Sequence, residues 1–175
     1  INNSLSKVKI MRDLFIESVD IYRNQLRTEV AAKATKFFKD VVMEKDYTQL
    51  KITDNFGLKV ISKNGEVNPN NSAGLSAIVA YSLITAIHNV KDESAPLVLD
   101  AAFERIDGPR QQKIVSQLPS VSKQLLILGL EKDIGQSIFK ILGSSVKGHY
   151  GLVRSADSNY QTEIKKFSWQ KVWKI

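Results

Sequence analysis

The fold of this chain is decided by the stretch from Asn71 to Asp107, whose two apolar parts read NSAGLSAIVAYSLITAI and APLVLDAAFERID. A Ser-Ala-Gly turn opens the first part, and apolar residues then recur every three or four positions, which predicts a helix from about Ala73 to Asn89. The second part is a short apolar run that ends on Asp100, which predicts a buried strand with a carboxylate at its C-terminal end. Ligands of open α/β sheets bind at such strand ends, and helix N-termini bind anions. The stretch therefore predicts phosphate chemistry.

The order and spacing of these features resemble the C-terminal lobe of an ABC-type ATPase head. In that family the Ser-x-Gly turn is the signature motif, the apolar run with its Asp is Walker B, and the second Asp belongs to the D-loop. The resemblance covers most of residues 50–134. With the helical lead-in, the chain is most similar to SMC-like ATPases of DNA repair and of bacterial DNA-modification or defence systems, including the DndD type. The alternative is an unrelated α/β domain.

The resemblance implies roles for individual residues. Ser72, Ala73 and Gly74 occupy the signature positions, which contact the γ-phosphate of ATP bound on the opposite head. Asp100 takes the Walker B position, which holds Mg²⁺ through water. Asp107 is the D-loop Asp at the interface between two heads. Ser72 also reads as a helix N-cap, which is compatible with the functional role.

Three positions depart from the family pattern. Ala101 follows Asp100 where the family commonly has a catalytic Glu, Leu75 replaces the usual Glu after the signature Gly, and Leu130 stands where many members carry a switch His. Without a base to orient the attacking water, hydrolysis is expected to be slow or absent. Glu104 is the nearest remaining acid and the one candidate catalytic residue, although it would need an unusual loop to reach the water.

The sequence contains no P-loop of the form GxxxxGK[ST], which ATP hydrolysis in this fold requires. The glycine-flanked basic run at 143–148 reads as a loop. ATP and Mg²⁺ binding would therefore need a P-loop lobe from an N-terminal segment outside this sequence. Because the chain begins at Ile1 within a helical pattern, we expect it to be part of a longer protein.

The first 45 residues carry an apolar seam that predicts one long helix. The seam consists of Leu5, Val8, Met11, Phe15, Val19, Tyr22, Leu26 and Val30. Its spacing favours a coiled-coil arm, and the alternative is a core helix with a partner inside this chain. We expect residues 1–46 to be the end of an arm and residues 47–175 to be the C-terminal lobe of the head.

The remaining pattern completes an α/β fold in which parallel strands are flanked by helices. A loop is expected at 67–71, and Gly108 with Pro109 is expected to break the chain. The tail from Phe167 to Ile175 is expected to pack on the head or to contact a partner. The other expected elements are a β-hairpin at 49–53 and 57–62, a helix at 110–118, a buried strand at 123–128 parallel to the first, a helix at 135–142, and late strands at 150–154 and 161–167.

Composition restricts the possible environments and partners. The chain has 25 Lys and Arg against 18 Asp and Glu, which gives a formal charge of +7. This charge suits the binding of DNA phosphates, and the alternative is that it only keeps the surface soluble.

The chain has no cysteine, which excludes disulfides and thiolate metal sites and fits a reducing cytoplasm. No stretch is expected to span a membrane. His88, near a helix end, is expected to meet solvent or the helix dipole and not to take part in catalysis.

Two functions follow from these observations. The first is an ATPase head lobe that pairs with a second head over ATP and so clamps or remodels DNA in repair, DNA modification or antiviral and plasmid defence. Its partners would be the P-loop lobe, the second head, DNA and, in some systems, nuclease or modification-enzyme subunits. The second is a degenerate, noncatalytic head that serves as a structural or interaction module in a DNA-associated complex.

Overall fold

The computed structural model describes residues 2–65, 72–90, 95–101, 103–130, 133–154 and 161–167. The loop at 67–71 and the tail beyond Phe167 lie outside the described residues. In chain order the elements are α1 (Asn2–Val41), β1 (Tyr47–Ile52), β2 (Leu58–Ser62), α2 (Ala73–Val90), β3 (Leu97–Asp100), α3 (Gly108–Gln117), the 3₁₀ turn η1 (Leu118–Ser120), β4 (Leu125–Leu128), α4 (Gln136–Leu142), the 3₁₀ turn η2 (Gly143–Ser145), β5 (His149–Arg154) and β6 (Thr162–Phe167). The predicted α/β fold with a long leading helix is confirmed.

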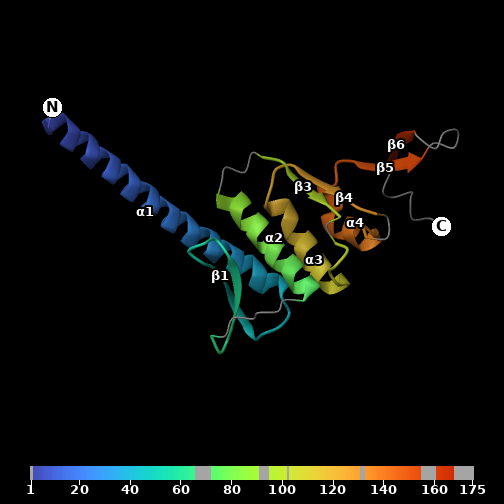
Figure 1. Cartoon of the computed structure of the whole chain (residues 1–175). Coiled ribbons are helices and arrows are strands. Elements are labelled where there is room, and N and C mark those ends of the chain that lie inside the picture. The colour runs from blue at the N-terminus through green and yellow to red at the C-terminus, as the bar shows by residue number, and fades with distance from the viewer. Residues whose placement is uncertain are drawn as a thin grey trace.

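Helix α1 is 40 residues long and projects from the body of the molecule (Figure 1). Its apolar seam is exposed from Leu5 to Tyr22, whereas one face of its C-terminal part is buried, namely Val30, Ala34, Phe37, Phe38 and Val41. The helix is therefore an arm in its N-terminal part and a core helix at its C-terminal end. It ends at Val41, earlier than expected, where buried Val42 turns the chain back toward β1. The division of the chain at residue 46 stays a prediction.

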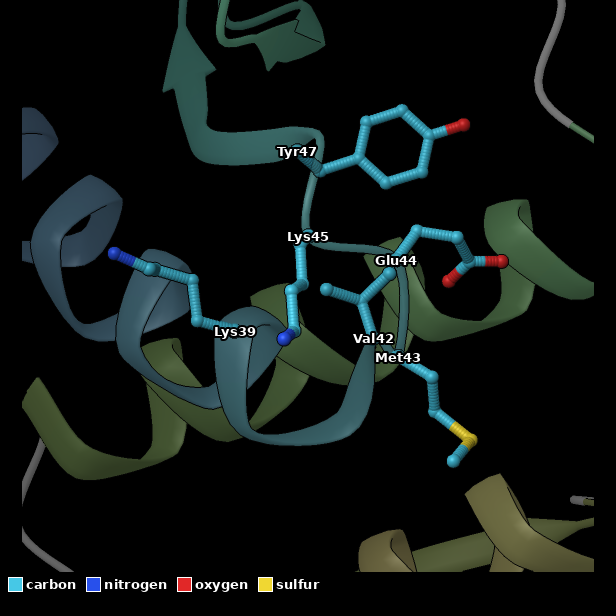
Figure 2. Close-up of a pocket in the computed structure, with 6 residues that line it drawn as sticks. All are labelled: Lys39, Val42, Met43, Glu44, Lys45 and Tyr47. Carbon is cyan, nitrogen blue, oxygen red and sulfur yellow. The ribbon is translucent and has the colours of Figure 1, made fainter.

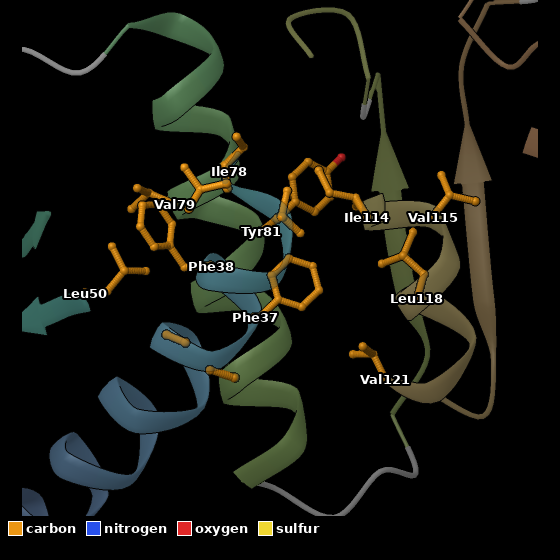
Figure 3. Close-up of a cluster of buried hydrophobic side chains, with 14 of the residues drawn as sticks. Phe37, Phe38, Leu50, Ile78, Val79, Tyr81, Ile114, Val115, Leu118 and Val121 are labelled. Carbon is orange, nitrogen blue, oxygen red and sulfur yellow. The ribbon is translucent and has the colours of Figure 1, made fainter. Parts of the chain in front are cut away.

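The core lies where α1, the β1–β2 hairpin, α2 and α3 meet (Figure 3). Phe38 of α1 and Ile114 of α3 are fully buried. In Figure 3, Phe38 lies toward Leu50 of β1, whereas Phe37 lies on the side of α3. Neighbouring side chains thus fix the end of α1 to both halves of the head, because a close-packed interior tolerates little displacement.

The predicted hairpin is confirmed as an antiparallel ladder of β1 and β2, with Leu50 opposite Val60. Both of these residues are buried against the helices, as period-2 alternation requires. Thr35 of α1 holds the hairpin, because its hydroxyl accepts from the Leu50 N–H at 3.0 Å and donates to the Leu50 carbonyl at 3.1 Å. At the tip, Arg27 of α1 pairs with Asp54. The hairpin and the base of the arm are therefore one packed unit.

Strands β3 and β4 are parallel, as predicted, and align Leu97 with Leu125 and Asp100 with Leu128. The expectation that both strands are buried was wrong. Leu97 and Leu99 are buried, but Val98, Leu126 and Leu128 are 54%, 51% and 42% exposed. Successive side chains point to opposite faces of a sheet, and within the described chain the helices cover one face only. The other face is an exposed apolar surface.

Helix α3 begins at Gly108 and includes Pro109, although these residues were expected to break the chain. Proline suits the first turn of a helix, because its N–H would have no partner there and its φ is already helical. Asp107 is the N-cap, with its side chain accepting from the Arg110 N–H. Gly108 and Pro109 therefore do interrupt the preceding segment, but they do so as the first residues of α3.

The C-terminal pair of strands, β5 and β6, is confirmed as an antiparallel hairpin that extends from the body beyond α4 (Figure 1). Leu152 and Ile164 face one another across this ladder and are largely exposed. His149 lies between Phe139 of α4 and Phe167 of β6, with ring centroids 4.8 and 5.6 Å away. These ring contacts attach the hairpin to α4.

Helix α2 corrects one expectation from composition. It is the one helix of the described chain that is long and apolar enough to cross a membrane, with 18 residues. Seven of its residues are buried, among them Ile78 and Val79. Burial of this kind is the usual property of a core helix in a soluble protein, so we interpret the apolar composition as packing.

Candidate functional site

Ser72 stands immediately before α2 and caps it. Its hydroxyl accepts a hydrogen bond from the Leu75 N–H at 3.2 Å, and its carbonyl accepts from the Ser76 N–H at 2.9 Å. Ser72 and Ala73 are exposed, so the first turn of the helix is open to solvent. The unpaired N–H groups of such a turn attract anions. The N-cap interpretation of Ser72 is confirmed, and the hydroxyl stays at the surface.

Gly74 brings the start of α2 against the turn that follows β3. A Cβ at this position would lie 3.2 Å from the carbonyl oxygen of Arg105. About two turns further along α2, the ring of Tyr81 stacks on that of Phe103, with centroids 6.3 Å apart and 8° between the ring planes. Burial raises the pKa of Tyr81 to about 12. The start of α2 and the segment between Asp100 and Asp107 are thus in direct contact.

Asp100 ends β3 with an exposed side chain, and the backbone ladder with β4 continues one residue further through the Ala101 N–H and the Leu128 carbonyl (3.1 Å). Ala101 has φ 47°, a left-handed conformation that is unusual for any residue except glycine. The chain therefore turns sharply away from the strand at the position where the family would place a Glu. Glu104 is exposed on the following turn.

Asp107 is held by Arg110, three residues along in α3. One carboxylate oxygen accepts from the Arg110 N–H at 3.1 Å, and the other accepts from the guanidinium. The same guanidinium donates to Glu44, in the turn after α1. Partial burial acts to raise the pKa of both carboxyls, but the hydrogen bonds and charge of Arg110 lower the pKa of Asp107 and of Glu44 overall. The two carboxylates in turn raise the pKa of Arg110.

Leu130 is exposed in the turn after β4, where the family would carry a His. Its carbonyl accepts from the N–H groups of Asp133 and Ile134, and the side chain of Gln111 donates to the Asp133 carbonyl at 2.8 Å. Helix α3 therefore holds this turn in place. At position 130 the turn therefore has an exposed apolar side chain in place of an imidazole.

A shallow, mostly apolar hollow lies between α2 and β3. Its lining includes Ala77 and Ile84 of α2, Val98 and Asp100 of β3, and Ala101. It continues the exposed face of β3 and β4. Asp100 therefore lies where an uncovered apolar surface meets the C-terminal end of the sheet.

Sequence reasoning placed Ser72, Ala73, Gly74, Asp100 and Asp107 in one site. The structure brings the start of α2 against the segment from Asp100 to Asp107, through the approach of Gly74 to Arg105. The assigned roles in binding are predictions. Sequence reasoning missed Arg110 and Glu44; an Asp followed three residues later by Arg at a helix start could have suggested the first.

The donor set suits a magnesium ion that keeps most of its water. No group of three or more His, Cys, Asp or Glu gathers within the described part of the chain. Mg²⁺ is usually bound by one or two carboxylates together with substrate phosphates, not by a cage of protein ligands. The exposed carboxylate of Asp100 fits that description.

Comparisons with known proteins place the fold. No protein-family model and no curated protein matches the chain. Solved structures do match. The chain has the fold of an SMC ATPase head lobe with its coiled coil.

One match comes from a study of ATP-driven dimerization and DNA-stimulated activation of SMC ATPases, with a TM-score of 0.63 and 14% identity over 87% of this chain and 91% of that one. The Smc head domain with a coiled coil and joint from Pyrococcus yayanosii gives a TM-score of 0.69 at 14% identity. A Pyrococcus furiosus Smc head bound to the C-terminal domain of ScpA gives 0.66 at 13% identity. Each of these two matches includes 94% of the residues of this chain. Because the matched chains are longer, the same alignments include only 31% and 40% of their residues.

Proposed function

We propose that this chain is the C-terminal lobe of an SMC-like ATPase head, which pairs with a second head over ATP and Mg²⁺. The observation that carries the proposal is the contact of the start of α2, at Gly74, with the turn between Asp100 and Asp107. It brings a helix N-terminus against the turn that connects a strand-end carboxylate, Asp100, to a second carboxylate, Asp107. A nucleotide held by another lobe needs such groups on the facing surface.

In this proposal each residue has a separate task. The Ser72 hydroxyl and the first N–H groups of α2 bind the terminal phosphate of ATP held by the opposite head. Asp100 orients the water shell of Mg²⁺, whose chemistry is to neutralise phosphate charge. Asp107 contacts the opposite head beside the nucleotide.

The P-loop lobe is proposed to cover the exposed face of β3 and β4. Val98, Leu126 and Leu128 form an apolar surface there, and Ile84 and Ile87 of α2 are also exposed, 41% and 42%. Exposed apolar surface of this extent usually marks an interface. A lobe seated on it would hold its bound nucleotide close to Asp100, since Asp100 lines the hollow beside α2.

The noncatalytic head is the second candidate, and the backbone at Ala101 favours it. A left-handed residue without a carboxylate offers no base for the attacking water, so nucleotide would be bound and only slowly hydrolysed. Glu104 is the residue that would have to supply a base. In this second candidate the chain is a structural or interaction module of a DNA-associated complex. For either candidate we propose a cytoplasmic place in DNA repair, modification or defence, with DNA and, in some systems, nuclease or modification-enzyme subunits as partners.

The isolated chain is expected to bind ATP negligibly, because the P-loop that cradles the phosphates is absent from it. Equilibrium titration with a fluorescent ATP analogue measures this. The control is the same chain joined to its P-loop lobe, which should bind. Micromolar affinity of the chain alone would contradict the split-head proposal.

The assembled protein is expected to bind duplex DNA mainly through phosphates, so its affinity should fall steeply between about 50 and 200 mM salt. Lys51 and Lys59 are candidate contacts. They stand directly opposite each other on the exposed face of the β1–β2 hairpin, where like charges destabilise a ladder, and neither has an acidic partner among the described residues.

Replacing Lys51 and Lys59 by Gln should reduce the slope of log affinity against log salt by about 1 for each lysine. Lys63→Gln is the matched control, because Asp46 lies 3.9 Å from the Lys63 amine and already offsets its charge. Fluorescence anisotropy at four salt concentrations gives the slopes. Binding that did not respond to salt would point to a protein partner and leave the basic surface with a solubilising role.

A further inference from the structure

Arg110 joins two carboxylates that come from segments far apart in the sequence. One terminal nitrogen of its guanidinium donates to Asp107, and the other donates to Glu44. Asp107 caps α3, and Glu44 lies in the turn just after α1. The side chain of Arg110 is 25% exposed, whereas the side chains of Asp107 and Glu44 are 45% and 46% exposed. The cation is thus the most enclosed member of the group.

The geometry of arginine accounts for this arrangement. A guanidinium presents donors in a rigid plane, so it can hold two carboxylates in fixed directions, whereas a lysine amine is a single point charge. The remaining donor of Arg110, at Nε, is buried and has no hydrogen-bond partner among the described residues. The two terminal nitrogens therefore provide the polar contacts that set the position of the side chain.

Both carboxylate oxygens of Asp107 accept a hydrogen bond from Arg110. One accepts from the Arg110 backbone N–H at 3.1 Å, and the other accepts from the Arg110 guanidinium. The carboxylate is therefore fixed to the first turn of α3 and cannot rotate without breaking one of these bonds. A movement of the Arg110 side chain therefore acts on one of the two bonds that hold Asp107.

Glu44 moves with the end of the arm. Val41 and Val42, just before it, are buried, and Phe38, one turn earlier, is fully buried in the core. Figure 2 shows Glu44 on the opposite side of this turn from Lys39 and Lys45. Those two lysines therefore do not compete for its carboxylate, and Arg110 is its cation.

An ordinary surface ion pair is the simpler interpretation, because such pairs contribute little to stability. The position of this pair, between the end of α1 and the start of α3, argues that it also links the movements of the two helices. The bond between Arg110 and Glu44 joins the turn after α1 to the first turn of α3, so a rotation of α1 against α3 acts on this bond and, through Arg110, on Asp107. The bridge is thus a mechanical link between the arm and a residue of the pairing surface.

We propose that Arg110 is a positioning residue that couples the orientation of the α1 arm to the placement of Asp107, through its bond to Glu44. The inference rests on the proposed function, since Asp107 matters here as a residue of the surface where two heads pair. It assigns the head a contact by which a change in the arm strengthens or weakens that pairing.

The test uses the assembled head, in which this chain is joined to its P-loop lobe and arm. Glu44→Gln should leave the melting temperature and the affinity of a single head for ATP unchanged, and should weaken ATP-dependent pairing by at least about 5-fold in sedimentation experiments. Arg110→Gln should weaken it further, because Asp107 is then released as well. Arg110→Lys should not restore it, since one amine cannot hold both carboxylates.

A double-mutant cycle separates the bridge from a general charge effect. Glu44→Gln combined with Arg110→Gln should pair no worse than Arg110→Gln alone, because the two residues act through one bond. Asp46→Asn removes the same charge two residues from Glu44, from a pair with Lys63, and should pair normally. If Glu44→Gln pairs as the unmodified head does, the bridge has no role in pairing and the inference is overturned. If the unmodified head itself does not pair on ATP, the proposed function fails first, and that result is distinguishable.

Discussion

Replacing Ser72 by arginine is expected to abolish ATP-dependent pairing of two heads while leaving the fold intact. The hydroxyl of Ser72 caps α2 through the Leu75 N–H at 3.2 Å, and loss of such a cap costs about 1 kcal/mol. Ser72 is exposed, so a longer side chain meets solvent and not the core. In the pair of heads, however, that side chain would occupy the space proposed for the terminal phosphate. Size-exclusion chromatography with light scattering in Mg-ATP measures the pairing.

Ser72→Ala is the matched control, because it removes the same cap without adding bulk. Both variants should lower the melting temperature equally. Alanine should weaken pairing, whereas arginine should eliminate it. Normal pairing of Ser72→Arg would reduce Ser72 to an N-cap, and the signature assignment would have to be withdrawn.

Elements whose side chains repeat with a local period could be predicted from the sequence. The helix after Ser72 follows from apolar residues three and four apart, and the β1–β2 hairpin follows from alternation around a turn. The order of the motifs at Ser72, Asp100 and Asp107 also predicted the head fold. Each of these signals depends on residues within one or two elements, so the local sequence is enough to predict the element.

Contacts between distant segments could not be predicted in the same way. Nothing in the sequence near Glu44 indicates that Arg110, 66 residues away, is its partner. The exposed face of the sheet was missed for a related reason. A continuous apolar run such as that around Val98 predicts a strand that is buried on both faces. It does not indicate whether the second face is covered by this chain or by another lobe.

At Ala101, which departs from the family pattern, the sequence and the backbone geometry both argue against a catalytic base. Ala101 was noted because it lacks a carboxylate, and the structure adds that its backbone is left-handed, with φ 47°. The side chain of residue 101 therefore leaves the strand in an unusual direction. A Glu placed there by mutation would have to adopt the same strained backbone before it could act as a base.

Replacing Asp100 by asparagine is expected to remove pairing at ordinary Mg²⁺ concentrations. Asp100 is exposed at the end of β3, and its backbone position is fixed by the parallel ladder with Leu128, so an isosteric side chain leaves the fold unchanged. An amide lacks the charge that orders the water around Mg²⁺. Loss of such a contact lowers metal affinity about 10- to 100-fold, so the Mg²⁺ needed for pairing should rise by a similar factor.

Titration of Mg²⁺ at fixed ATP, followed by light scattering, gives the midpoint for each protein. Asp54→Asn is the control, because it removes one exposed carboxylate from the β1–β2 turn, far along the chain from β3. Its midpoint should equal that of the unmodified head. If Asp100→Asn also paired at the unmodified midpoint, the carboxylate would have no part in holding the metal. Asp100 would then be only the last residue of a strand, and the phosphate site proposed at the end of this sheet would lose its metal-orienting residue.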